Sequence, residues 1–116
     1  MSVAFDVERV LAELTLEEKA ALTSGSDFWH TDGVERLGVP KVMVTDGPHG
    51  LRKQAESADH LGIGNSVPAT CFPPAAALAS TWDVDRLGRV GRALGRETRG
   101  NDVAVLLGPG VNMKRS

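Results

Sequence analysis

The chain has 116 residues, the size of one small domain, and 41% of them are hydrophobic, which is too many for a disordered segment. Its 13 Lys and Arg nearly balance its 15 Asp and Glu, so charge gives no reason to expect nucleic acid or an anionic membrane as a partner. The single cysteine, Cys71, cannot form an internal disulfide, and its neighbours predict a small buried residue.

The first residues lack the basic stretch and apolar run of a signal peptide, and no uncharged apolar segment approaches membrane-spanning length. A reducing, cytoplasmic location is therefore the expectation.

The N-terminal part predicts two short helices. Asp6 can accept hydrogen bonds from the amides of a first helical turn, and an apolar stripe follows it at helical spacing. The stripe comprises Val7, Val10, Leu11 and Leu14. Thr15 and Glu18 then form a capping box, in which each side chain bonds the backbone amide of the other residue. The second helix is expected to run to about Thr23.

The next pattern is an apolar run over residues 41–45, which predicts a strand buried on both faces, as in a parallel sheet. The strand should stop at residues 46–50, because two Gly and one Pro lie there. Residues 53–66 show no helical period and so offer no crossover helix. A short strand over residues 67–71 would therefore lie antiparallel to the first.

The clearest helix of the sequence begins after Asp83, its predicted N-cap, and stops at Gly100 and Asn101. Trp82 and Leu87 occupy the positions of a hydrophobic staple across its start. One face of this helix is apolar or small, comprising Val84, Leu87, Val90, Gly91 and Leu94.

A second apolar strand is predicted over residues 103–107, so the later half follows a strand–helix–strand order and the fold class is α/β. A buried strand needs neighbours on both edges and cover on both faces. So few elements cannot supply them. The sequence therefore predicts either self-association or, more simply, a fragment of a larger sheet.

Asp46 and Arg52 are the candidate site residues, because in α/β proteins the loops after the strands' C-terminal ends build the active site. A carboxylate at a strand tip can accept from two adjacent hydroxyl groups, and an Arg can orient it or bind another hydroxyl. This combination suits a polyol ligand. The alternative is a turn acid that caps its own backbone beside a surface Arg.

The other polar residues do not form a metal site by their spacing, which matches no zinc pattern. They are His30, His49, His60, Asp46 and Asp59. No metal or other cofactor is expected. His49 is predicted to be packed or hydrogen-bonded within its loop, and Trp29 either packs in the core or lines a sugar site.

Five segments, in order along the chain, resemble signatures of β-glucosidases of glycoside hydrolase family 3. They are Leu14-Thr15-Leu16-Glu17-Glu18-Lys19, Asp27-Phe28-Trp29-His30, Thr45-Asp46-Gly47-Pro48-His49-Gly50-Leu51-Arg52-Lys53, Ser66-Val67-Pro68-Ala69-Thr70-Cys71-Phe72-Pro73 and Leu106-Leu107-Gly108-Pro109-Gly110-Val111-Asn112-Met113-Lys114-Arg115. One such segment is weak evidence, whereas five in order are specific.

This resemblance implies that residues 1–116 are the truncated N-terminal part of an irregular TIM-barrel-like domain, with only its first strands and helices. It implies a retaining, exo-acting β-glucosidase in which Asp46 and Arg52 bind sugar hydroxyls at the −1 subsite. The family's nucleophile and acid/base lie further along, so no catalytic residue is assigned, and the chain alone is expected to be inactive. The implied partners are a β-glucoside or related glycoside and the remainder of the parent chain. The alternative is a stand-alone, non-catalytic carbohydrate- or protein-binding module.

Overall fold

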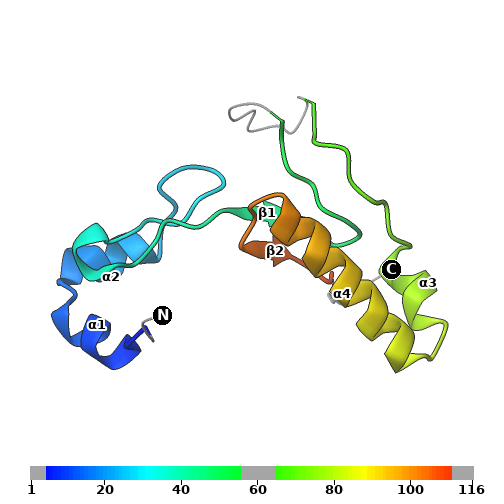
Figure 1. Ribbon diagram of the computed structural model, residues 1–116, viewed down its shortest axis with the longest axis horizontal. Coiled ribbons are helices and arrows are strands. Elements are labelled where there is room, and N and C mark those ends of the chain that lie inside the picture. Colours follow the sequence, from blue (N-terminus) through cyan, green and yellow to red (C-terminus); the bar gives the residue numbers. More distant parts are fainter. Residues whose placement is uncertain (1–4, 56–64, 111–116) are drawn as a thin grey trace, which may run out of the picture. The chain divides into compact units, whose positions relative to one another are not determined.

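The computed structural model describes residues 5–55 and 65–110, which fall into two compact units, Met1–Val42 and Met43–Ser116. The first unit contains α1 (Val7–Glu13), α2 (Leu16–Leu22) and a 3₁₀ turn, and the second contains a small assembly of strands and helices (Figure 1). Among the described residues, no helix combines the length and apolar character needed to cross a lipid bilayer.

The first unit begins with two helices whose N-termini are closed by side chains. In α1 (Val7–Glu13), the Asp6 carboxylate accepts from the Arg9 amide at 3.0 Å. In α2 (Leu16–Leu22), Thr15 and Glu18 form both bonds of the capping box. These caps satisfy amides that have no partner within the helix, and both were predicted from sequence.

The core of the first unit forms where these helices meet a later turn. A single 3₁₀ turn, η1 (Glu35–Leu37), ends at Gly38, which adopts the left-handed conformation with φ +70°. The buried side chains of this core come from α1, its C-cap and the turn: Val10, Leu14, Val34 and Leu37. Leu22 and Val39 pack against them, so this unit has an apolar centre of its own.

The second unit is built on a two-stranded parallel sheet of β1 (Val44–Asp46) and β2 (Val105–Leu107). Val44 pairs with Val105, and Asp46 pairs with Leu107. Both strands are shorter than predicted. Two helices lie between them in sequence, which supplies the crossover that a parallel pair requires. The α/β class is confirmed for this part of the chain.

The predicted strand over residues 67–71 is wrong, because these residues form no strand. The segment instead runs antiparallel to the continuation of the loop after β1. The Val67 amide donates to the Lys53 carbonyl at 2.8 Å, and the Phe72 amide donates to the His49 carbonyl at 2.8 Å. Pro68 has no amide hydrogen to donate. The two segments are therefore joined by separate hydrogen bonds and do not form a continuous ladder.

Helices α3 (Ala75–Ala79) and α4 (Val84–Gly100) follow this segment. Asp83 caps α4 by accepting from the Arg86 amide at 2.8 Å, as predicted, and the helix ends at the predicted residue. The predicted hydrophobic staple is wrong. Trp82 is 93% exposed with φ +53°, so the left-handed turn before the cap directs its ring into solvent.

The apolar face of α4 lines an open groove of about 800 Å³ within the second unit. Leu78 of α3, Leu94 of α4 and Leu106 of β2 lie along it. The strands are not buried on both faces as predicted, because only Thr45 is buried among their residues and Leu107 is 53% exposed. No other element described in this unit covers these surfaces.

Candidate sugar-binding site

The loop after β1 folds back on the strand through two hydrogen bonds to backbone carbonyl groups. The Arg52 amide donates to the Asp46 carbonyl at 3.0 Å, and the Thr45 hydroxyl donates to the Arg52 carbonyl. Thr45 is 1% exposed, so its hydroxyl closes the loop from inside. These bonds fix both ends of the loop, and with them the two residues predicted to bind ligand, Asp46 and Arg52.

Two glycines of this loop are required by close contacts. A Cβ at Gly47 would lie 2.6 Å from the Gly50 carbonyl oxygen and would also collide with the Leu106 side chain on β2. Gly50 has φ +147°, a conformation that residues with a side chain avoid, and its Cβ would collide with the Thr70 carbonyl. The loop is therefore packed tightly between the end of β2 and residues 69–72.

Residues 69–72 form a second wall opposite this loop. They lie beside it because the Phe72 amide bonds the His49 carbonyl and because Gly50 permits a close approach. Cys71 stands on this wall and is exposed, so the prediction of a buried cysteine is wrong. The His49 side chain is exposed rather than packed, although its carbonyl is hydrogen-bonded.

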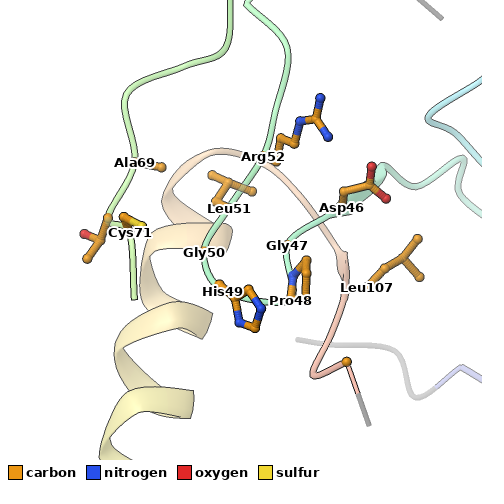
Figure 2. A pocket seen from close by; sticks show the side chains of 12 residues that line it. Asp46, Gly47, Pro48, His49, Gly50, Leu51, Arg52, Ala69, Cys71 and Leu107 are labelled. Carbon is orange, nitrogen blue, oxygen red and sulfur yellow. The ribbon is translucent and has the colours of Figure 1, made fainter. Parts of the chain in front are cut away.

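Between the two walls lies an open cavity of about 660 Å³. Its polar lining includes Asp46, His49, Arg52 and Thr70, and β2 contributes Leu107. Asp46 is half-buried and Arg52 is exposed. Figure 2 shows both side chains extending from the upper part of the loop as drawn, whereas His49 lies at its turn.

Asp46 is the last residue of β1, is half-buried and is among the residues that line the cavity. The carboxylate can accept hydrogen bonds from two hydroxyl groups, and the Arg52 guanidinium can donate to a third. Their assignment to sugar binding stays a prediction at this point.

The anchors of the two walls are Glu97 on α4 and Asn101, the C-cap of that helix, and sequence reasoning missed both contacts. The Glu97 Oε1 atom accepts from the Thr70 amide at 2.9 Å and from the Thr70 hydroxyl at 3.1 Å. The Lys53 ammonium donates to the Asn101 carbonyl at 2.6 Å, just past the helix end. Thr70 and Glu97 are 27 positions apart in the sequence, and the partners of the other contact are 48 positions apart, so no local pattern indicates either contact.

A separate polar cluster in the first unit centres on Asp27. Its carboxylate accepts from the Trp29 and His30 amides at 2.8 and 2.9 Å, from the His30 ring, and from Lys41 at 3.3 Å. The hydrogen bond from the Trp29 amide is the main cause that holds the pKa of Asp27 far below its ordinary value. The hydrogen bonds from the His30 and Lys41 side chains act in the same direction. Trp29 itself is half-buried. These contacts fix a loop.

No group of three or more potential metal ligands converges among the described residues. His30 lies in the first unit, whereas His49 and Asp46 lie in the second. Asp59 and His60 of the candidate set lie outside the described residues.

No family model matches the chain. Individual proteins do match. The chain is 60% identical over 114 residues to thermostable β-glucosidase B of Acetivibrio thermocellus, a match that spans 98% of the chain. It is 58% identical over 105 residues, 90% of its length, to an exo-α-(1→6)-L-arabinopyranosidase of Bifidobacterium longum.

Solved structures give the same result. A β-glucosidase of Kluyveromyces marxianus in complex with glucose superposes with a TM-score of 0.81 and 45% identity over 94% of the chain. A GH3 β-glucosidase of Bifidobacterium adolescentis superposes with a TM-score of 0.75 and 54% identity over 91%. The chain belongs to glycoside hydrolase family 3. This family 3 chain spans 15% of the first relative's length and 12% of the Kluyveromyces chain.

Proposed function

We propose that residues 1–116 are the N-terminal part of a retaining, exo-acting β-glucosidase and begin its TIM-barrel-like domain. In this proposal Asp46 and Arg52 supply part of the −1 sugar subsite, and the catalytic carboxylates lie beyond residue 116. The single observation that carries the proposal is the position of Asp46 at a strand tip on a cavity rim, within a chain 60% identical to a β-glucosidase.

The proposed chemistry divides the work between this chain and the rest of the enzyme. In retaining hydrolysis one carboxylate attacks the anomeric carbon, and a second carboxyl group protonates the leaving oxygen and then activates water. Asp46 has neither role here. Its carboxylate binds hydroxyl groups of the sugar, and hydrogen bonds that strengthen as the ring flattens lower the barrier to reaction.

The proposed partner of this chain is the remainder of its parent protein. The groove along α4 and the exposed residues of β2 are apolar, and Val105 is 43% exposed. Surfaces of this kind are unusual on a protein that works alone. In the proposed enzyme, further strands and helices of the barrel cover them. The rival module would have to be soluble and melt cooperatively as the 116-residue chain.

A second candidate substrate is an α-L-arabinopyranoside, because a relative named for that activity is 58% identical to the chain. A panel of p-nitrophenyl glycosides, given to the full-length protein that contains this chain, separates the two candidates. We expect the highest kcat/KM with the β-D-glucoside. A higher value with the α-L-arabinopyranoside would replace the proposed substrate.

The proposal is tested by Asp46→Asn in the full-length protein. Losing charge-assisted bonds to the sugar, worth about 3 kcal/mol, should lower kcat/KM about a hundredfold. The matched control is Asp85→Asn, which changes an exposed carboxylate on α4 and should leave the kinetics unchanged. Thermal melting of both variants should stay close to wild type. Near-normal kinetics of Asp46→Asn would remove this residue from the site.

A further inference from the structure

The two walls of the cavity are both held by the C-terminal part of α4. The wall containing Asp46 and Arg52 continues to Lys53, whose ammonium donates to the Asn101 carbonyl at 2.6 Å. A cation at this position also interacts favourably with the negative end of the helix dipole. The Asn101 side-chain amide in turn donates to the Glu97 carbonyl at 2.9 Å.

The second wall is held by the Glu97 side chain. One oxygen, Oε1, accepts both the amide and the hydroxyl of Thr70. The other, Oε2, is buried and has no hydrogen-bond partner among the described residues. A negative carboxylate that receives two donors from one residue fixes the backbone and the rotamer of that residue together. Thr70 lines the cavity, whereas Glu97 does not.

We propose that Glu97 is a positioning residue for the sugar site, which acts together with the Phe72–His49 hydrogen bond to hold the wall at residues 69–72 in place beside the Asp46 loop. This inference rests on the proposed function. The position of this wall affects the cavity because the wall contacts the loop directly. The Thr70 carbonyl lies against Gly50 and leaves no space for a Cβ. If the anchor is removed, the second wall moves relative to Asp46, and the hydrogen bonds that hold the sugar in the ground state weaken as their distances and angles depart from the optimum.

The main test compares Glu97→Ala with Glu97→Gln in the full-length protein. The Ala variant loses the acceptor for Thr70, whereas Gln keeps a carbonyl oxygen at the same reach. We expect KM for the best p-nitrophenyl glycoside to rise about tenfold in Glu97→Ala and less than about threefold in Glu97→Gln. Asp85→Asn on the same helix should keep the wild-type KM.

KM separates positioning from a loss of folded protein, because a smaller active fraction lowers the apparent kcat and leaves KM unchanged. If Glu97→Ala fails to fold, Thr70→Val provides a milder change, since it removes the hydroxyl donor and keeps the amide. We expect its KM to rise about threefold. A wild-type KM in a folded Glu97→Ala or Thr70→Val variant would overturn the proposal.

Hydrogen exchange distinguishes failure of this inference from failure of the proposed function. The Thr70 amide is protected by Glu97, so the peptide covering residues 69–72 should exchange faster in Glu97→Ala, with Glu97→Gln close to wild type. This readout needs no substrate. If exchange changes in Glu97→Ala but the full-length protein hydrolyses no glycoside, the proposed β-glucosidase activity is refuted and the role of Glu97 as an anchor stands. If exchange does not change, the role of Glu97 as an anchor is refuted.

Discussion

The two units of the chain differ in what they bury. The first encloses four apolar side chains around α1 and η1, and Leu14 at its centre is 7% exposed. The second leaves an apolar groove open along α4 and presents polar residues around a cavity beside β1. The first unit is closed by helix caps and by its own apolar core, whereas the cavity walls of the second are held by hydrogen bonds between segments far apart in the chain.

This difference separates stability from function within a short chain. A closed core gains its stability from hydrophobic burial, which depends on volume and little on precise direction. The cavity depends on where walls lie, and therefore on hydrogen bonds and on glycines that allow close approach. Changes in the first unit should alter stability, and changes in the second should alter ligand binding.

Among the variants that test this comparison between the two units, the largest effect is expected from Gly50→Ala. Its Cβ would collide with the Thr70 carbonyl, and φ +147° adds strain of about 1 to 3 kcal/mol. The two walls must then separate, so kcat/KM for a p-nitrophenyl glycoside should fall more than about thirtyfold. Gly38→Ala in the first unit is the control, because Gly38 has φ +70° but no neighbouring atom within 4 Å of its Cβ position. Equal losses in both variants would show that strain alone matters.

A smaller effect, on stability alone, is expected from Leu14→Ala. Removing this side chain from the small core should lower the free energy of unfolding by about 2 to 3 kcal/mol, measured by chemical denaturation. KM should remain at the wild-type value. Leu11→Ala is the matched control, because Leu11 is 47% exposed on α1 and should cost much less. A Leu14→Ala variant with full stability and altered KM would reverse the comparison between the units.

The smallest effect expected is a pH dependence at the bond between Glu18 and Arg36. The Arg36 side chain, followed by the Thr15 amide, lowers the pKa of Glu18 to about 2 from 4.5. Because the folded pKa is depressed, the stabilisation is present above about pH 4.5 and is lost as the pH falls toward 2. The difference in melting temperature between wild type and Glu18→Gln should therefore shrink over that interval. A difference independent of pH would mean that the charge contributes nothing.

Local elements of the fold were predictable because their signals lie within one helical turn. Asp6, Thr15 and Asp83 each bond an amide three residues ahead, so spacing in the sequence identifies them. The short helix α3 was not predicted, since it begins after Pro74 with no side-chain cap. Trp82 has the right spacing for a staple, but its left-handed backbone turns the ring outward.

For the candidate site, the sequence predicted one wall and missed the other. Asp46 follows an apolar run and precedes two glycines, so its position at the end of a strand could be predicted. The wall at residues 69–72 and its anchor Glu97 could not be predicted from the sequence. Hydrogen bonds between residues far apart in the chain have no fixed spacing, so no periodic pattern in the sequence indicates them.

The sequence by itself determined the capped helices, the strand that ends at Asp46 and the family to which the chain belongs. Only the tertiary structure decided that β1 pairs with β2, that residues 69–72 face the Asp46 loop and that α4 anchors both walls. The physical reason is range. Capping and turn preferences act between neighbouring residues, whereas strand pairing and cavity walls depend on which distant surfaces meet when the chain buries its apolar side chains.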